Sequence, residues 1–360
     1  MKRFLVIQTA FLGDAVLATG LLEKLHAHFP DAAIDLVVRQ GHEGLFDGHP
    51  FLHRVFVWDK RRGKTRALFR LIGDLRRTEY DHILNAQRFF STGLMTVLAR
   101  GKEKVGYDKN PLSILFTRSV KHVIGDGRHE MDRLNELIAH LTDGTRPLPR
   151  LHPTPKARAE AHEHMSTWSH EHMPTRPRPV PPQRDAHMPT WARPVPSQRD
   201  GHMPYVCLFP ASVWFTKQWP EHKWVALVKA LPTDHAVFLL GAPGDSALAQ
   251  RISAASGRGV DLCGRLSLLG TAALMEGAVM NVVNDSAPLH IAGAVNAPVT
   301  AIFCSTVPAF GFGPLRANGR LVETTEKLDC RPCGLHGHRV CPKGHFRCAE
   351  GIEVRRVLGA

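Results

Sequence analysis

The residues that could carry chemistry fall into three short segments, each lying where a predicted strand gives way to a predicted helix. In the first, QTAFLGDAVLATGLLEKL at 8–25, Gly13 and Asp14 follow the apolar run RFLVIQ at 3–8. A carboxylate at the end of a strand can act as a general base, and the dipole of the following helix would keep it ionised. Asp is also a favoured helix N-cap, and taken alone that structural role is the simpler explanation of Asp14.

The second segment, LFPASVWFTKQWPEHKWVAL at 208–227, places Ser212, Thr216 and Lys217 in a loop before a helix that starts near Trp219. A lysine just before a helix N-terminus is well placed to bind a diphosphate, because it adds a mobile charge beside unpaired N–H groups. The ordinary alternative is a surface lysine. Ser212 and Thr216 lie in the same loop.

The third segment, VVNDSAPLHIAGAVNAPVTAIFCSTVPAF at 282–310, runs from a strand into Asp285 and Ser286 and then into a helix that carries His290. Asp and Ser both suit a helix start, where backbone N–H groups can bind phosphate. A lone helical histidine is more often structural than catalytic. The sequence has no GxxxxGK[ST], GxGxxG or HExxH motif and no carboxylate cluster that indicates a divalent metal. Lys217 and helix N-termini would therefore have to offset the charge of a nucleotide diphosphate, and no catalytic cofactor is expected.

The tail is rich in cysteine and histidine. CRPCGLHGHRVCPKGHFRC at 330–348 has the spacing C-x2-C-x7-C-x6-C, with three histidines interspersed. This pattern is compatible with a structural zinc site, and the alternative is a tail whose cysteines are reduced or disulfide-paired. The predicted ligands are Cys330, Cys333, Cys341 and Cys348. The remaining three cysteines lie singly in apolar runs and are interpreted as core residues.

The elements that must position these residues alternate between strand and helix, which predicts parallel sheets covered by helices on both faces. Two such α/β units, 1–149 and 205–360, are expected to be Rossmann-like domains facing a cleft. An amphipathic helix is predicted at 128–141. The predicted strands lie at 3–8, 33–38, 54–58, 81–85, 104–107, 205–210, 236–241, 260–263, 279–284 and 298–304.

The segment 150–204 is rich in Pro, His and Arg and poor in aliphatic residues, so it is predicted to be a disordered or semi-rigid linker. It contains a tandem repeat, HMPTRPRPVPPQRDA at 172–186 and HMPTWARPVPSQRDG at 187–201. The prolines favour extended polyproline conformations without a core.

The 360 residues carry a formal net charge of +13, which favours anionic partners. The densest basic group is interpreted either as a solvated helix face or as a membrane or acceptor patch. No secretory signal or membrane-spanning stretch is recognised, so a cytoplasmic protein is expected, with contact to the cytoplasmic membrane face left open. The basic group comprises Lys60, Arg61, Arg62, Lys64, Arg66, Arg70, Arg76 and Arg77.

These segments resemble glycosyltransferase family 9, the ADP-heptose:lipopolysaccharide heptosyltransferases. The resemblance covers nearly the whole chain except 150–204. It rests on Gly13-Asp14, on Lys217-Gln218-Trp219-Pro220, on LCGRLSLLGTAALMEGA at 262–278, on NDSAPLHIAGA at 284–294 and on HEMDRLNELI at 129–138.

The resemblance implies a GT-B fold with a lipid-linked, anionic glycan acceptor in the N-terminal domain and an ADP-sugar in the C-terminal domain. It further implies inversion at the sugar without a metal, with Asp14 as the base. Many members have Gly-Pro-Thr where this chain has Cys304-Ser305-Thr306. The implied donor-binding residues are Ser212, Thr216, Lys217, Gly264, Leu266, Asp285, Ser286 and His290.

Two other classes remain as alternatives. One is a different enzyme on the same two-domain plan, such as a nucleotide-sugar epimerase or hydrolase, which would not need the Gly13-Asp14 turn paired with this donor motif. The other is a non-catalytic nucleotide- or nucleic-acid-binding protein, prompted by the charge. The chain lacks interleaved aromatics and any nucleic-acid recognition module, so nucleic acid is not expected as a partner.

Overall fold

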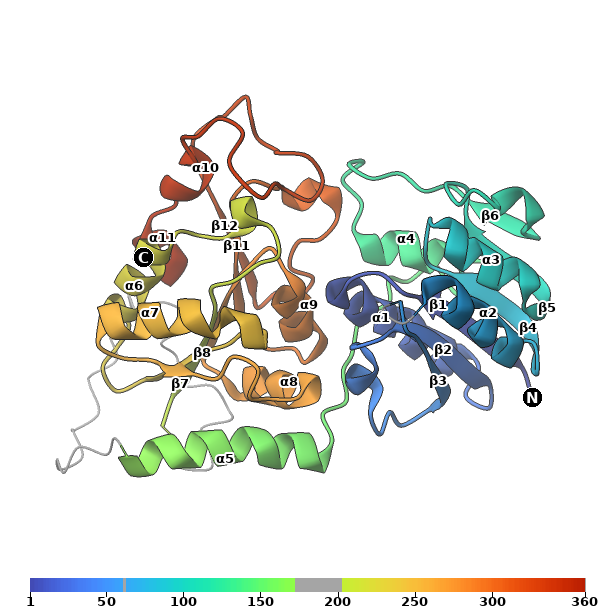
Figure 1. Ribbon diagram of the computed structural model, residues 1–360, viewed down its shortest axis with the longest axis horizontal. Coiled ribbons are helices and arrows are strands. Elements are labelled where there is room, and N and C mark those ends of the chain that lie inside the picture. The colour runs from blue at the N-terminus through green and yellow to red at the C-terminus, as the bar shows by residue number, and fades with distance from the viewer. Residues whose placement is uncertain (61–62, 172–202, 360) are drawn as a thin grey trace. The chain divides into compact units, whose positions relative to one another are not determined.

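The computed structural model describes residues 1–60, 63–171 and 203–359, which form two compact units. The first unit comprises 1–152 and a short return segment at 308–312, and the second comprises 153–307 and 313–360. Each unit is built around its own parallel sheet (Figure 1). The predicted α/β class is confirmed in both.

The sheet of the first unit has the order β3-β2-β1-β4-β5-β6, and every neighbouring pair of strands is parallel. This is the order of a doubly wound sheet, in which the chain leaves one strand and returns along either side of it. The strands are β1 (Arg3–Gln8), β2 (Ala33–Arg39), β3 (Leu52–Trp58), β4 (Glu79–Asn85), β5 (Arg100–Tyr107) and β6 (Arg118–Val120). The helices are α1 (Leu12–His28), α2 (Lys64–Leu75), α3 (Phe90–Leu98) and α4 (Glu130–Glu136), with short 3-10 turns at Glu43–Phe46, Ser113–Leu115 and Pro308–Phe310.

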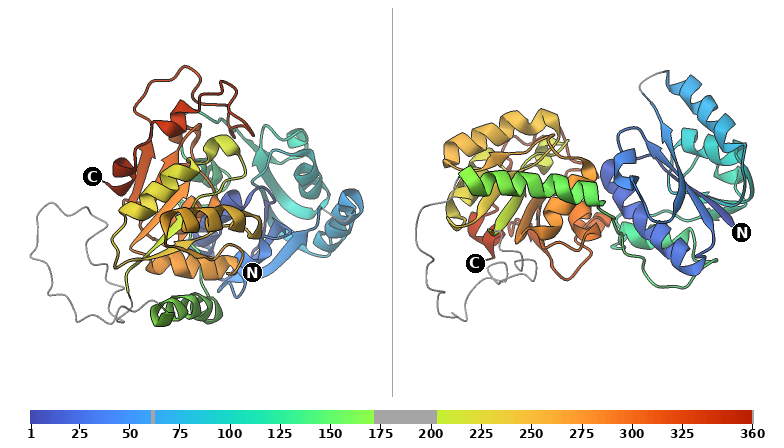
Figure 2. Two further views of the ribbon diagram at one scale, coloured as in Figure 1. Left: turned by 60° about the vertical axis from the view of Figure 1, so that its left-hand side comes forward. Right: turned by 90° about the horizontal axis from the view of Figure 1, so that it is seen from below.

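Helices cover both faces of this sheet (Figure 2). Successive side chains of a strand point to opposite faces, so the buried run of β1 supplies two layers of core. Leu5 and Ile7 share one apolar cluster with Leu71 of α2 and Met95 of α3. On the other face α1 packs against α4. Burial on both faces explains why β1 and β2 are almost continuously apolar.

The second unit repeats the same plan, with the sheet order β12-β11-β10-β7-β8-β9 and parallel pairing throughout. Trp219 and Trp224 are buried in its main apolar cluster. The strands are β7 (Tyr205–Phe209), β8 (Ala236–Leu239), β9 (Val260–Asp261), β10 (Met280–Asn284), β11 (Val299–Phe303) and β12 (Gly319–Glu323). The helices are α6 (Glu221–Ala230), α7 (Ser246–Ser256), α8 (Leu268–Gly277), α9 (Ala287–Ala294), α10 (Arg347–Glu350) and α11 (Val354–Leu358), with 3-10 turns at Phe215–Lys217 and Pro243–Asp245.

The first part of the predicted linker is ordered, which corrects the expectation of disorder for it. Residues Pro155–Glu171 form helix α5, which packs against α8 within the second unit. Ala157 and Ala161 are buried, and the Glu160 carboxylate accepts hydrogen bonds from the Ser267 backbone N–H at 2.7 Å and from its hydroxyl at 2.5 Å. The second unit therefore begins at Pro153 rather than at 205. The tandem repeat at 172–201 lies outside the described residues.

Other differences from the sequence-based expectations are small. The helix expected at 128–141 is regular only over Glu130–Glu136, and turns follow it. Strands β6 and β12 and helices α10 and α11 were not predicted. No helix in the described ranges combines the length and the apolar character needed to cross a bilayer.

Candidate active site

Doubly wound sheets bind ligands at the carboxyl ends of their strands, at the point where the strand order reverses. In the first unit that point lies between β1 and β4, and in the second between β7 and β10. Asp14 follows β1, Lys217 follows β7, and Asp285 follows β10 directly. All three predicted residues thus lie at the ligand-binding edge of their own sheet.

Asp14 is the third residue of helix α1 rather than its N-cap, which corrects the proposed capping role. Phe11 occupies the cap position, and its backbone N–H donates to Asp14 Oδ2 at 3.2 Å. The Asp14 carboxylate therefore stabilises the helix start from inside the first turn. A structural contribution and a catalytic one remain compatible, because this hydrogen bond occupies only one carboxylate oxygen.

The Asp14 carboxyl has a pKa well above the ordinary value for an aspartate. Burial, and next the negative charge of Glu130, raise the pKa of the Asp14 carboxyl to about 7 from its ordinary value of 3.8. Hydrogen bonds from backbone N–H groups and the positive charge of Arg88 oppose this rise without cancelling it. The helix dipole, which was expected to keep Asp14 ionised, favours the charged form, but desolvation of the carboxylate has the larger effect on the pKa. A carboxylate with a pKa near neutrality is well matched to general base catalysis.

Glu130 is held in place by a buried network at the start of α4. Its carboxylate accepts a hydrogen bond from the Arg133 Nε at 2.7 Å, and its backbone N–H donates to the Gly311 carbonyl at 2.8 Å. Arg133 is fully buried and also donates to the Phe310 carbonyl at 2.7 Å. These contacts fix the return segment 308–312 to α4 and hold the Glu130 carboxylate in place.

In the second unit the predicted donor residues form a charged pair. Lys217 Nζ lies 2.7 Å from Asp285 Oδ2, and the side chains are only 15% and 7% exposed. The Thr306 hydroxyl donates to the same Asp285 oxygen at 2.5 Å. An ammonium, a carboxylate and a hydroxyl thus meet at the end of β10, beside the first backbone N–H groups of α9. Such an arrangement can bind a diphosphate through the lysine and the helix N-terminus.

Asn284, which sequence reasoning passed over, connects the two strand ends that carry this pair. Its Oδ1 accepts from the Trp219 backbone N–H at 3.0 Å, and its Nδ2 donates to the Pro210 carbonyl at 2.8 Å. The side chain is fully buried. It fixes the loop that carries Lys217 against the residue before Asp285. Asn284 could have been noticed in the sequence because it directly precedes Asp285. Its role could not, because its hydrogen bonds are to residues that follow the neighbouring strand β7.

The other predicted donor residues are placed as follows. Ser286 is the N-cap of α9, and its hydroxyl donates to the Asn284 carbonyl at 3.2 Å rather than capping the helix. His290 is buried within α9. Ser212 accepts a hydrogen bond from Gln218 through its carbonyl at 2.7 Å. Gly264 is exposed with φ +71°, and a Cβ there would lie 2.6 Å from Pro243. Leu266 is half-buried two residues further on.

The cysteine-rich tail folds onto the loops that carry the donor residues. The Cys333 N–H donates to the Ser305 carbonyl at 2.8 Å, and the His338 N–H donates to the Thr216 hydroxyl at 2.8 Å. Arg331 donates to the Thr306 carbonyl at 2.8 Å and forms an ion pair with Glu323. These contacts position Thr306 and Thr216, and no local sequence pattern predicts them.

The four tail cysteines do not form a ready ligand cage. All are free thiols, and the Cys333 thiol donates to the Cys330 carbonyl at 3.1 Å. Among the described residues, no three of the tail's Cys or His ligand atoms lie within 4.8 Å of one another. The zinc site at Cys330, Cys333, Cys341 and Cys348 stays a prediction.

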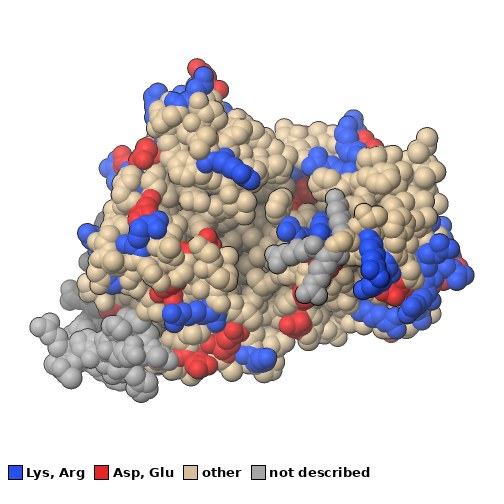
Figure 3. Space-filling model, in the orientation of Figure 1, with Lys and Arg blue, Asp and Glu red and all other residues tan. Residues whose placement is uncertain are grey.

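Basic side chains gather over the region of α2 (Figure 3). Arg66, Arg70, Arg76 and Arg77 are exposed there. Lys60 differs, because its ammonium donates to the Thr9 carbonyl at 3.0 Å and lies 4.4 Å from the centre of the Trp58 ring. Arg61 and Arg62 lie outside the described residues. Lys60 therefore lies beside the loop between β1 and α1, whereas the four arginines lie on α2.

This chain is similar in sequence to heptosyltransferases. The sequence profile of glycosyltransferase family 9 (heptosyltransferase) matches residues 68–338. Lipopolysaccharide heptosyltransferase 1 of Pseudomonas aeruginosa is 25% identical over 349 residues, which cover 92% of this chain and 86% of that protein. Lipopolysaccharide heptosyltransferase 1 of Escherichia coli K12 is 26% identical, with 86% of this chain and 91% of that protein covered.

Solved structures show the same fold. A family 9 glycosyltransferase from Veillonella parvula superposes with a TM-score of 0.81 at 18% identity, covering 99% of this chain and 95% of that one. The Escherichia coli heptosyltransferase WaaC with ADP superposes with a TM-score of 0.65 at 22% identity, covering 89% and 92%. The predicted GT-B architecture of two Rossmann-like units is confirmed.

Proposed function

The chain belongs to glycosyltransferase family 9 and is a glycosyltransferase, and from that premise we propose that it transfers heptose from ADP-heptose to a lipopolysaccharide core acceptor. We further propose that the transfer inverts the anomeric carbon and needs no catalytic metal. The observation that carries the proposal is the Lys217–Asp285–Thr306 cluster at the donor edge of the second unit. Relatives named lipopolysaccharide heptosyltransferase 1, and WaaC solved with ADP and with ADP-2-deoxy-2-fluoro heptose, support this choice of donor and acceptor.

In this reaction the acceptor hydroxyl attacks the anomeric carbon as the bond to the ADP oxygen breaks. The hydroxyl loses its proton to Asp14, and the negative charge moves onto the departing diphosphate. Direct displacement inverts the configuration and requires the base on the side of the sugar opposite to the leaving group. A base in one unit and a diphosphate site in the other satisfy that requirement when both act on one sugar.

Lys217 stabilises the departing diphosphate in this scheme. Its ammonium already faces a carboxylate oxygen of Asp285, so it is positioned to exchange or share that contact with a phosphate oxygen. Negative charge on the diphosphate grows in the transition state, and a contact that strengthens as the charge grows lowers the barrier. Lys217 and the N-terminus of α9 together supply the positive potential that a divalent ion supplies in metal-dependent transferases.

The acceptor is proposed to bind the first unit near Asp14. The exposed side chains of Phe11, Phe89 and Phe90 flank the loops after β1 and β4, and the α2 arginines lie on the same unit. Apolar rings with arginines suit an anionic glycolipid, which carries both acyl chains and phosphates. Contact with the cytoplasmic membrane face would follow from binding such an acceptor.

The experiment is a transfer assay with ADP-heptose and a heptose-free lipopolysaccharide precursor, analysed by mass spectrometry and by NMR of the new glycosidic bond. The proposal expects one heptose added, ADP released in equal amount, the anomeric configuration inverted and activity retained in EDTA. Conversion of ADP-heptose without a glycosylated product would instead favour an epimerase or hydrolase, which was the alternative enzyme class.

A further inference from the structure

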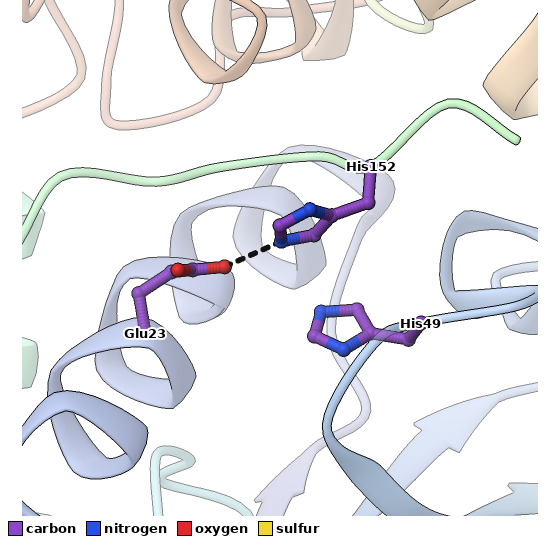
Figure 4. A group of neighbouring side chains, drawn as sticks. All are labelled: Glu23, His49 and His152. Atoms are coloured by element: carbon purple, nitrogen blue, oxygen red, sulfur yellow. Dashed lines mark hydrogen bonds and ion pairs between the residues drawn. The ribbon is translucent and has the colours of Figure 1, made fainter. Parts of the chain in front are cut away.

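A histidine- and carboxylate-containing cluster lies in the first unit, away from the residues proposed for sugar transfer. It consists of Glu23 on α1, His49 in the loop before β3, and His152, the last residue of that unit's main segment (Figure 4). Glu23 is nine residues beyond Asp14 on the same helix, which is about 14 Å along its axis. The cluster is thus separate from the proposed base.

Glu23 and His152 are hydrogen-bonded to each other, whereas His49 has no hydrogen-bond partner among the described residues. His152 Nε2 lies 2.7 Å from Glu23 Oε1. Both ring nitrogens of His49 are buried, and within the described part of the chain no protein group hydrogen-bonds either of them. A buried imidazole with two unsatisfied nitrogens is costly unless it has a partner of another kind.

Neighbouring rings hold the imidazole of His49 in place. It packs edge-on against Phe51, with centroids 4.5 Å apart, and against His152, with centroids 4.9 Å apart. A ring fixed in this way, with both nitrogens unpaired among the described residues, is preorganised to offer one of them to a metal ion.

The spacing of the three side chains fits a metal ion after small adjustments. One ligand atom from each residue lies within 4.8 Å of the other two. Three atoms at that spacing are at most about 2.8 Å from their common centre, and zinc bonds to imidazole nitrogen and carboxylate oxygen measure about 2.0 to 2.2 Å. Inward movements of less than about 1 Å, within the reach of side-chain rotations, would complete the three bonds.

We propose that Glu23, His49 and His152 bind a divalent transition-metal ion of the zinc type. Two imidazole nitrogens and one carboxylate oxygen suit zinc, cobalt or nickel better than magnesium or calcium, which prefer oxygen ligands. The ion would join α1, the loop before β3 and the end of the unit's main segment. Its role is structural, so it is independent of the sugar-transfer proposal.

A second cluster of the same composition serves as the control. His82 and His140 both hydrogen-bond Glu103 Oε2, at 2.8 and 3.1 Å, and Arg118 contacts the other oxygen at 3.4 Å. There the histidines and the carboxylate already satisfy one another, and a guanidinium adds positive charge. His140→Gln therefore removes a histidine from a similar trio without removing the proposed site.

The test is equilibrium dialysis of the full-length chain against Zn²⁺ and Co²⁺, comparing the wild-type protein with His49→Gln, Glu23→Gln and His140→Gln. Any binding by the cysteine tail or by the histidines of 172–202 is common to all four proteins. Binding of Co²⁺ to thiolates also adds a near-ultraviolet charge-transfer absorption, whereas a site made of nitrogen and oxygen adds only weak visible bands.

The proposal expects His49→Gln and Glu23→Gln to bind one equivalent less than the wild-type protein, with loss of the visible Co²⁺ bands of that site. It expects Zn²⁺ to raise the melting temperature of the wild-type and His140→Gln proteins more than that of either site variant. Equal stoichiometry in all four proteins, or an equal loss in His140→Gln, would overturn it. If His49→Gln does not fold in EDTA, the stoichiometry of Glu23→Gln decides in the same way.

Discussion

Burial raises the pKa of Asp14, yet Asp14 must be ionised to act as a general base. With a pKa of about 7, the base form grows as pH rises through neutrality. We predict that kcat/KM rises with pH through about 7 and then levels off. A pH–rate profile measured at low donor concentration checks this. A profile already flat from about pH 5 would contradict it.

The same shift predicts a change in stability. The folded pKa of Asp14 lies above its ordinary value of 3.8, so the folded protein holds a proton that the unfolded chain releases between about pH 4 and pH 7. The contribution of Asp14 to stability is present below about pH 4 and is lost as pH rises through about 7. Asp14→Asn should therefore gain stability relative to the wild type with rising pH. Urea unfolding at about pH 5 and pH 8 tests this, and a difference independent of pH would refute it.

Lys217 is proposed to bind the diphosphate of the donor. Removing its ammonium takes away a charge-assisted contact to the diphosphate and leaves the buried Asp285 carboxylate without its ion-pair partner, where it repels the donor. We expect Lys217→Ala to lower kcat/KM for ADP-heptose by roughly a hundredfold. Lys229→Ala, which alters an exposed lysine of the same unit, is the matched control. Equal values for the two variants would show that Lys217 does not touch the donor.

For single residues, the positions of Asp14, Lys217 and Asp285 at strand ends could be predicted from local sequence, because each follows a recognisable strand. The charges and hydrogen bonds that surround them could not be predicted in this way. Glu130 raises the pKa of Asp14 from a different helix, and Thr306 reaches Asp285 from the end of a different strand. Such contacts depend on which strands are neighbours, and that information is not local.

Among the elements, helix α5 shows where composition misled the interpretation. Its sequence is polar and continues into the proline-rich repeat, so the whole of 150–204 was interpreted as a linker. The helix has little apolar surface of its own, and Ala157 and Ala161 allow it to lie close to α8. Tertiary packing, rather than a strong apolar stripe, makes it part of the second unit.

The contact between α5 and α8 gives a prediction at this scale. Glu160 accepts two hydrogen bonds from Ser267, the N-cap of α8. Glu160→Ala should lower the free energy of unfolding by about 1 to 2 kcal/mol, because a charged acceptor at a helix start is lost. Urea denaturation measures the change, with Lys156→Ala on the exposed side of α5 as control. Equal stability of the two variants would mean that α5 does not support α8.

At the scale of the whole molecule, alternation of strand and helix was enough to predict two doubly wound units. The boundary between the units was harder to predict, because the second unit begins at Pro153 and residues 308–312 belong to the first unit. That return depends on Arg133 and Glu130, which bind the backbone of Phe310 and Gly311 from far away in sequence. No local pattern encodes such a contact.

The repeat at 172–201 has the composition of a polar, proline-rich linker, and we predict that its removal changes stability little. Loop length adds only slowly to the entropy of closing a loop. The deletion variant should melt within about 2 °C of the full chain and bind ADP equally well. Differential scanning calorimetry measures the first quantity and titration calorimetry the second. A large loss of either would give the repeat a structural role.

We propose that the two units contribute different parts of one transfer, with the base from the first unit and the diphosphate site from the second. The most direct test is Asp14→Asn, which keeps the size of the side chain and its hydrogen bond to Phe11. We expect an unchanged Kd for ADP, because the proposed donor site lies in the other unit, together with turnover of ADP-heptose lowered by about a hundredfold or more. An Asn variant that binds ADP and transfers heptose at the wild-type rate would contradict it.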